Sequence, residues 1–154
     1  MNKRTYNLKE MVEGNQYSAL LKFSLDLCDR FTLVIRPTLG LNAKAIQAIE
    51  TLLPFLLSSK DKSSWPGTEL LVGKATVNEY TFNRDSLEMI LRLSNSLYEW
   101  KQPYLPEDLA LIRNDHSLFL GSIAHESDAF MILTRKELDL LRKIIPTLTA
   151  DEDV

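Results

Sequence analysis

The chain has 154 residues, of which 45% are hydrophobic and 25% are charged, and its formal net charge at pH 7 is −3. This composition is typical of one soluble globular domain that is long enough to bury a core without a metal or a disulfide. The negative charge argues against a surface built for nucleic acid and favours a basic partner.

Cysteine content and hydropathy indicate the cellular location of the protein. Cys28 is the single cysteine, which excludes an intramolecular disulfide and a thiolate metal cluster within one chain. The basic N-terminus is followed by polar residues instead of the apolar run of a secretory signal, and no stretch of eighteen apolar residues occurs. We therefore expect a cytoplasmic protein that does not span a membrane.

The first part of the chain mixes helical and extended patterns. Residues 1–14 have no strong period, and we expect a short docked turn or a loose arm there. The stretch Asn15–Asp29 favours a helix, although Phe23 and Leu25 also fit an alternating strand. Phe31–Ile35 is rich in β-branched and aromatic residues, which is typical of a buried strand.

A second helix is expected after Asn42, which can cap its first turn. Isoleucines and leucines from Ile46 to Leu57 form one apolar stripe, with a kink or restart at Pro54. The Ser-rich stretch Lys60–Gly67 that follows is predicted to be a loop within the domain.

Two strand segments and a third helix come next. Leu70–Val72 and Ala75–Phe82 are predicted to be extended, the latter from its alternating pattern. Asp85 and Glu88 have the spacing of a capping box. We expect them to begin a helix that runs from Ser86 to about Trp100.

Three short strands joined by tight polar turns form a predicted β-meander: Leu109–Arg113, Leu118–Ala124 and Ala129–Leu133. Apolar residues on both faces of the middle strand indicate that helices cover it on both sides. The predicted fold class is α+β, in which an antiparallel sheet of about five strands packs with three to four helices in a single domain, residues 1–154.

The chain ends in a predicted helix and a polar tail. Thr134 and Glu137 have the spacing of a capping box, and the apolar stripe that follows continues to Ile145. Pro146 stops this helix, because proline cannot continue it. Residues 147–154 are expected to be a solvated acidic tail.

A histidine beside carboxylates lies in the second meander turn. His125 and Glu126, followed by Asp128, are a possible acid–base or metal arrangement. Because neighbouring strand residues point to opposite sides, the alternative is that His125 holds the turn by hydrogen bonding while the acids are solvated. His116 lies too far along the middle strand to share a metal ion with His125. No metal site and no cofactor are therefore expected.

Two further candidates are a carboxylate pair and a tryptophan. Glu107 and Asp108 could serve as proton donor and base, or could favour the start of a short helical turn after Pro106. Trp65 could be an interface anchor or an aromatic plug at the end of the core. The sequence has no G-x-S-x-G elbow, no Gly-rich phosphate loop and no dinucleotide fingerprint.

The segments WPGTEL, LYEWKQPYLPEDLALIR and SIAHESDAFMILT together resemble small, acidic bacterial immunity proteins of polymorphic-toxin and interbacterial competition systems. This resemblance implies a non-enzymatic cytoplasmic protein that binds a cognate toxin domain and occludes its active site, a cleft expected to be basic. The polar residues that it carries over are Glu107, Asp108, His125 and Glu126. Asp128 and Trp65 complete the candidate partner-binding residues.

The alternative hypothesis is a small ligand-binding or catalytic domain that uses His125 with nearby carboxylates. In an enzyme these side chains should converge in one concave pocket with perturbed ionisation. A binding protein should instead present a broad, exposed acidic and aromatic face.

Overall fold

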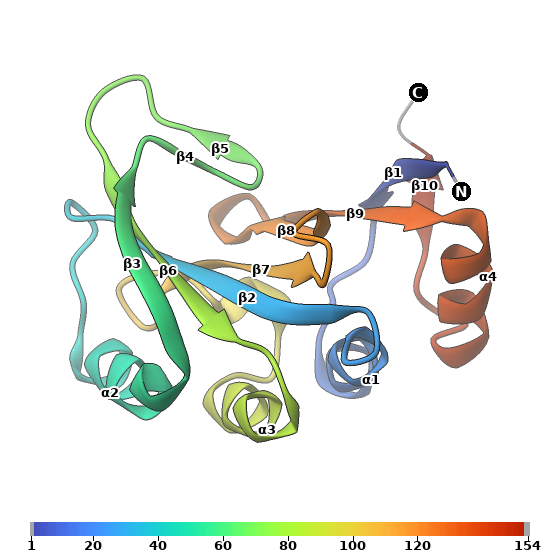
Figure 1. Cartoon of the computed structure of the whole chain (residues 1–154), viewed down its shortest axis with the longest axis horizontal. Coiled ribbons are helices and arrows are strands. Elements are labelled where there is room, and N and C mark those ends of the chain that lie inside the picture. The colour runs from blue at the N-terminus through green and yellow to red at the C-terminus, as the bar shows by residue number, and fades with distance from the viewer. Residues whose placement is uncertain (1, 153–154) are drawn as a thin grey trace.

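The computed structural model describes residues 2–152 and confirms the α+β class (Figure 1). Its main sheet comprises β1 (Lys3–Leu8), β2 (Cys28–Ile35), β3 (Leu56–Lys62), β6 (Ala75–Thr81), β7 (Glu107–Arg113), β8 (Leu118–Ile123), β9 (Asp128–Thr134) and β10 (Ala150–Glu152). Within the described residues this sheet has eight strands, more than the five or so expected, in the order β10-β1-β9-β8-β7-β2-β6-β3. All of its pairings are antiparallel.

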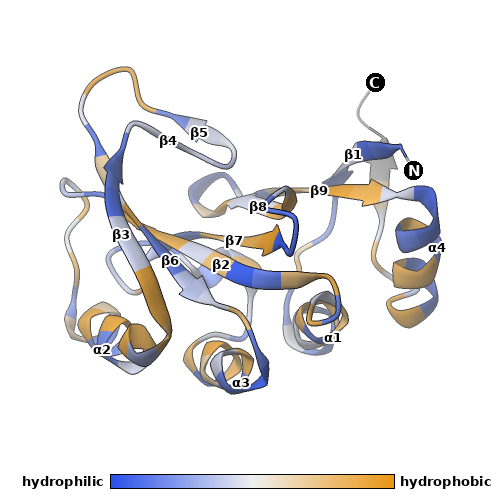
Figure 2. Ribbon diagram, in the orientation of Figure 1, coloured by the Kyte–Doolittle hydropathy of each residue, from blue (hydrophilic) through white to orange (hydrophobic). Residues whose placement is uncertain are grey.

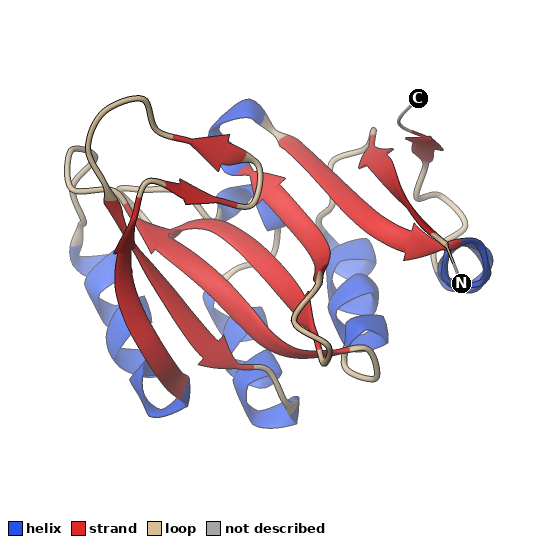
Figure 3. Ribbon diagram, turned by 45° about the horizontal axis from the view of Figure 1, so that its top comes forward, coloured by secondary structure: helices blue, strands red, loops and turns tan. Residues whose placement is uncertain are grey.

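The helices gather on one side of the sheet, and a small hairpin folds over the other side (Figures 1 and 3). The helices are α1 (Gly14–Ser24), α2 (Ala43–Leu52), α3 (Arg84–Leu93) and α4 (Arg135–Ile144), with short 3₁₀ turns η1 (Leu53–Phe55), η2 (Leu97–Glu99) and η3 (Ala124–Glu126). The hairpin consists of β4 (Ser64–Trp65) and β5 (Thr68–Glu69). The prediction that helices cover both faces of the meander was therefore wrong, because the hairpin and not a helix covers the second face.

The main core lies between the sheet and the helices. Phe31 and Leu33 point from β2 toward the helices, and both are fully buried. Phe31 stacks on Tyr80 of β6, with ring centroids 4.8 Å apart. Trp100 is also fully buried, and its indole nitrogen donates a hydrogen bond to the Tyr17 hydroxyl of α1 at 2.9 Å. This packing fixes the sheet on which the candidate sites are built.

The meander and the buried strand before it are confirmed. In the sheet order β9, β8 and β7 are neighbours, and Leu120 of β8 lies opposite Leu111 on one side and Met131 on the other. The predicted strands Phe31–Ile35 and Ala75–Phe82 correspond to β2 and β6. Each of these segments showed its period within a few residues, so local pattern was sufficient to find it.

Both ends of the chain are strands where the sequence indicated none. Residues 3–8 form β1, neither a docked turn nor a loose arm, and Tyr6 of β1 lies opposite Met131 of β9. Residues 150–152, part of the predicted acidic tail, form β10 and pair with β1. Residues 153 and 154 lie outside the described residues. Tyr6 and Leu8 pack in the main core, and pairing with β9 and β10 satisfies the backbone of the segment.

The predicted long helix after Asn42 divides into a helix and an edge strand. Asn42 does cap α2, since its side chain accepts a hydrogen bond from the Ala45 amide. The helix ends at Leu52, Pro54 lies in η1, and the chain then joins the sheet as β3. The predicted apolar stripe was wrong, because α2 buries Ala45, Ala48 and Leu52 and leaves Ile46 about half exposed.

The loop predicted for residues 60–67 is largely extended structure. Residues 60–62 belong to β3, and residues 64–65 form the first strand of the hairpin. Leu70–Val72, predicted to be a strand, is instead irregular, and the side chains of Leu71 and Val72 are 99% and 90% exposed. Residues 60–62 are extended because they pair with β6, whereas residues 70–72 belong to no strand of the described sheets.

The third and fourth helices are confirmed, with a correction to the bounds of α3. Asn83 and Ser86, and not Asp85 and Glu88, form the capping box, and the helix ends at Leu93 well before Trp100. The capping box of α4 is the predicted one, formed by Thr134 and Glu137.

Candidate functional site

The β4–β5 hairpin is fastened to the face of the sheet that carries no helices. The indole nitrogen of Trp65 donates a hydrogen bond to Oδ2 of Asp108 at 2.8 Å. The guanidinium of Arg36 lies 5.5 Å from the centre of the Trp65 ring, a cation–π distance. At the hairpin turn, a side-chain carbon on Gly67 would lie 2.8 Å from Cγ1 of Ile123 in β8. The turn therefore packs directly on the sheet, and only glycine fits there.

Five residues that include four of the sequence candidates are joined by hydrogen bonds around the start of β7, and we call them the Glu107 cluster: Glu107, Asp108, Gln102, His125 and Trp65. Glu107 is 1% exposed, and its Oε1 accepts a hydrogen bond from the Gln102 amide at 2.6 Å. The same oxygen lies 2.7 Å from Nε2 of His125. Oε2 of Glu107 is buried and has no hydrogen-bonding partner among the described residues.

Asp108 uses both of its carboxylate oxygens inside the protein. The residue is 3% exposed, and Oδ1 accepts a hydrogen bond from the Ala124 amide at 2.9 Å while Oδ2 accepts from Trp65. Its φ angle of 56° lies in the left-handed region, which aspartate adopts more readily than most residues. Asp108 therefore joins the hairpin to η3 across the start of β7.

The structure separates the sequence candidates into buried and exposed groups. Glu107 and Asp108 begin β7, and the predicted alternative of a helical turn after Pro106 does not occur. Trp65 is 7% exposed, so it plugs the space beneath the hairpin. His125 keeps 45% of its side chain exposed. Glu126 and Asp128 are exposed.

The electrostatics of Glu107 follow from its burial. Burial raises the pKa of Glu107 above the ordinary value for glutamate, and the nearby charge of Asp108 acts in the same direction. The hydrogen bond from the Gln102 amide and the proximity of His125 oppose this shift without cancelling it. The folded protein therefore holds a proton on Glu107 to a higher pH than the unfolded chain does.

Replacing Glu107 with glutamine is expected to stabilise the protein relative to the wild type as the pH rises. Because the folded-state pKa of Glu107 is raised, the wild type loses stability as the pH rises through that pKa. Glutamine cannot ionise, so it avoids this loss while retaining an oxygen for the Gln102 amide. Urea unfolding of both proteins between pH 4 and 8 measures the difference. Glu126→Gln is the exposed control, and parallel profiles for wild type and Glu107→Gln would contradict the prediction.

The hydrogen bonds limit what the Glu107 cluster can do chemically. A general base needs a lone pair that a substrate can reach. Both oxygens of Asp108 are occupied, and the unpaired oxygen of Glu107 faces the interior. Among the described residues, no three His, Cys, Asp or Glu side chains are placed to hold a metal ion. The geometry is that of a clamp that holds the hairpin, η3 and β7 together.

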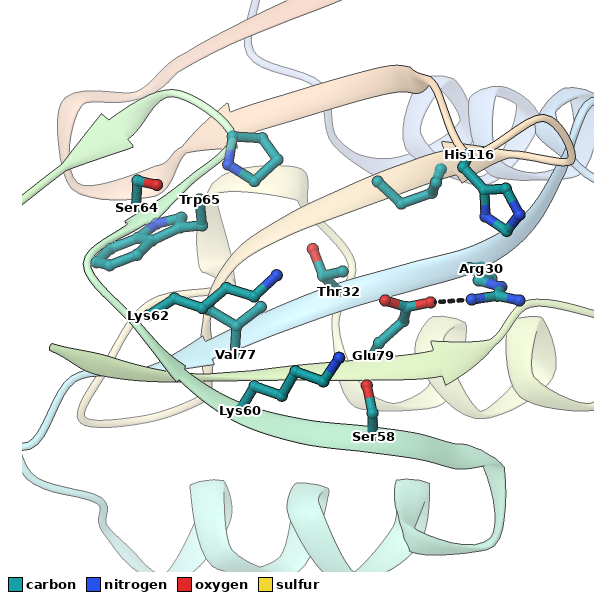
Figure 4. A pocket seen from close by; sticks show the side chains of 12 residues that line it. Arg30, Thr32, Ser58, Lys60, Lys62, Ser64, Trp65, Val77, Glu79 and His116 are labelled. Atoms are coloured by element: carbon teal, nitrogen blue, oxygen red, sulfur yellow. Dashed lines mark hydrogen bonds and ion pairs between the residues drawn. The ribbon is translucent and has the colours of Figure 1, made fainter.

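A second feature, which we call the hairpin groove, opens between the hairpin and the sheet (Figure 4). It is a cavity of about 290 Å³ beside β2, β3 and β6. Its polar lining includes Arg30, Thr32, Lys60, Lys62, Glu79 and His116. Its apolar lining is Trp65, Pro66, Val77 and Ile112.

Sequence reasoning missed this groove because it assigned Lys60–Gly67 to a loop. Ser58, Lys60 and Lys62 alternate along β3 and all line the groove. That period of two was the available signal, since it places the three side chains on one face of a strand. Figure 2 shows that β3 is hydrophobic at its start and hydrophilic toward its end, where the lysines lie.

Comparison with known proteins finds no family model that matches this chain, and no significantly similar curated protein or solved structure. Among the residues that the structure describes, none of the helices combines the length and the apolar character that crossing a bilayer requires.

Proposed function

We propose that this chain is a non-enzymatic, cytoplasmic immunity protein that binds a cognate toxin domain and occludes the active site of that domain. The observation that carries the proposal is the exposed acidic turn that the Glu107 cluster holds in place. The sequence resemblance to immunity proteins, the net charge of −3 and the absence of a recognised catalytic signature in the sequence agree with it.

Exposed acids from neighbouring elements form what we call the acidic turn surface: Glu99, Glu126 and Asp128. The turns η2 and η3, which carry Glu99 and Glu126, pack against each other. Burial raises the pKa of Tyr98 to about 12, and the charge of Asp128 acts in the same direction, which places that carboxylate near η2. An acidic surface of this kind is complementary to a basic toxin cleft and would speed association with it.

The Glu107 cluster holds η3, which carries Glu126 of this surface. Asp108 accepts the amide hydrogen of Ala124, the first residue of η3, and His125 pairs with Glu107. Ser127, at the end of η3, has a φ angle of 50° and donates its amide to the Ala124 carbonyl. A turn held in this way loses little conformational entropy on binding, so more of the interaction energy appears as affinity.

The catalytic alternative has one observation in its favour, the partly exposed His125 ring 2.7 Å from a buried carboxylate. A carboxylate in that position can orient an imidazole as a general base. The alternative predicts that His125→Gln abolishes a hydrolytic or transfer activity. The immunity proposal predicts that the same variant still binds the toxin domain.

Co-expression with the neighbouring gene tests the proposal. We expect the upstream reading frame to encode a large secreted protein whose C-terminal domain is toxic alone and harmless when this chain is present. Purified toxin domain and this chain should form a complex in gel filtration. Failure of the neighbouring product to bind would contradict the proposed function.

Reversing the charge of the acidic turn surface is expected to weaken the complex mainly by slowing its formation. In Glu126→Lys/Asp128→Lys both changed residues are exposed, so we expect the fold to be retained. The association rate constant at low salt should fall about tenfold or more, and the difference from wild type should shrink at high salt. The matched control is Asp26→Lys/Glu50→Lys, whose acids are exposed elsewhere. Stopped-flow experiments measure the association rate constants. If the Glu126→Lys/Asp128→Lys variant associates as fast as the wild type, the acidic turn surface is excluded as the toxin-binding surface.

A further inference from the structure

The hairpin groove has two positive charges without acidic partners. Lys60 and Lys62 lie on the same face of β3, and their side chains extend across the groove (Figure 4). Among the described residues, neither lysine has a carboxylate within ion-pair distance. Arg30 differs, because Glu79 neutralises it within the same groove. An anion that enters the groove would therefore be attracted to both ammonium groups.

A buried hydroxyl in the same groove also has no partner. Thr32 is 6% exposed, and its Oγ1 makes no hydrogen bond with any described residue. Figure 4 shows its side chain pointing from β2 into the space between Lys62 and Glu79. Buried polar groups are nearly always hydrogen-bonded in folded proteins, so an orphan hydroxyl in a groove indicates a missing partner. An anionic ligand would accept this hydrogen bond.

The remaining wall of the groove is apolar and well packed. Trp65 and Val77 belong to a small core that also contains Val34 and Ala75, and Ile112 of β7 adds to the lining. The groove therefore combines a cationic rim with an apolar floor. At about 290 Å³ it lies at the small end of ligand pockets, where it suits a metabolite-sized molecule and not a polypeptide.

We propose that the hairpin groove binds a small organic anion, a phosphate or carboxylate group attached to a compact ring or alkyl body. Lys60 and Lys62 neutralise the anionic group, and Thr32 donates a hydrogen bond to it. The body of the ligand packs on Trp65 and Val77. This site lies on the face of the sheet beneath the hairpin and is independent of the acidic turn surface, so the toxin-binding proposal can fail without affecting it.

Titration with simple aromatic ligands tests the proposal on the full chain alone. The probes are phenyl phosphate and benzoate, which distinguish the two anionic groups, with benzyl alcohol and benzylamine as neutral and cationic counterparts. We expect at least one anion to bind with a submillimolar Kd that rises with salt, and both counterparts to bind at least tenfold more weakly. Binding should change the fluorescence of Trp65. The other tryptophan, Trp100, is fully buried in the main core, so we expect the change in fluorescence to come from Trp65.

Two variants within the groove and one control variant locate the binding site. Lys60→Gln/Lys62→Gln changes exposed residues of an edge strand and should weaken anion binding about tenfold or more while the Tm stays near that of the wild type. Lys44→Gln/Lys136→Gln removes the same charge from α2 and α4 and should bind as the wild type does. Thr32→Val replaces the unpartnered hydroxyl with a methyl group of similar shape, and it should fold and bind several-fold more weakly.

Three results would overturn the proposal. The first is that neither anion binds at millimolar concentration. The second is that benzyl alcohol or benzylamine binds as tightly as the anions. The third is that the Lys44/Lys136 control loses as much affinity as the Lys60/Lys62 variant, which would reveal charge attraction without a site.

Discussion

Replacing Asp108 with alanine is expected to lower the free energy of unfolding by about 3 kcal/mol, since it leaves two buried donors without an acceptor. Those donors are the Trp65 indole nitrogen and the Ala124 amide. Alanine also tolerates the left-handed φ of 56° less well than aspartate does. Urea unfolding at pH 7 measures the loss. Amide exchange should also become faster in the hairpin, because its attachment to β7 is gone.

Two further variants separate the hydrogen bonds from the backbone strain. Asp108→Asn tolerates the same φ and keeps one acceptor oxygen, so it should lose clearly less stability than the alanine variant. Trp65→Phe removes the indole donor together with part of the ring, and a double-mutant cycle with Asp108→Ala, which isolates the interaction between the two side chains, should show coupling of roughly 1 kcal/mol or more. An Asp108→Ala protein within about 0.5 kcal/mol of the wild type would contradict the clamp assigned to this residue.

The parts of the fold that could be predicted are those in which the deciding partners lie close in sequence. The meander strands are separated by short polar turns, and the capping box of Thr134 and Glu137 closes within four residues. Short-range signals of this kind do not depend on the rest of the structure. The α+β class follows from them.

The edge strands could not be predicted because distant partners create them. Residues 3–8 contain only two buried apolar side chains, Tyr6 and Leu8, and become a strand because β9 offers an unpaired edge. Leu56 fits a helical stripe as well as a strand, and pairing of β3 with β6 decides between them. The helical pattern that ends before Pro54 was therefore extended too far along the chain, to Leu57.

The candidate site was predicted as separate residues and not as an arrangement. Glu107, Asp108, His125 and Trp65 were each identified from local sequence, but Trp65 and Asp108 meet across 43 positions of chain. Whether two adjacent carboxylates share an orientation depends on the positive φ of Asp108, which no sequence pattern revealed. The partner of Asp108, Trp65, also lies in the hairpin, which was predicted to be a loop.

A buried ion pair between Arg113 and Glu137 joins α4 to the sheet. Arg113 of β7 donates from Nη1 and Nη2 to the two carboxylate oxygens of Glu137, at 2.8 and 2.7 Å. Nη2 also donates to the Ile132 carbonyl of β9, and the guanidinium lies 4.9 Å from the centre of the Phe119 ring. The side chains of Arg113 and Glu137 are only 8% and 14% exposed. Arg113 thus links β7, β8, β9 and the first turn of α4.

Replacing Arg113 with methionine is expected to lower the free energy of unfolding by about 3–5 kcal/mol at pH 7, because it leaves the Glu137 carboxylate buried and unpaired. Burial alone would raise the pKa of Glu137, but the hydrogen bonds from Arg113 and Thr134 hold it below its ordinary value. The stability that this pair supplies is therefore present above the unfolded-state pKa and is lost as the pH falls through the folded-state pKa. The difference between wild type and variant should narrow at pH 3.

The double variant Arg113→Met/Glu137→Leu tests whether the loss comes from the unpaired charge. Apolar residues of similar size that replace both members of a buried ion pair are often tolerated, so the double variant should recover part of the stability that Arg113→Met loses. The recovery stays incomplete, because Glu137 also accepts the Thr134 amide at 2.8 Å and thereby caps α4. Urea unfolding at pH 7 and pH 3 measures all three proteins. A double variant less stable than Arg113→Met at pH 7 would show that the cap and the packing of Arg113, and not its pairing with Glu137, hold α4 against the sheet.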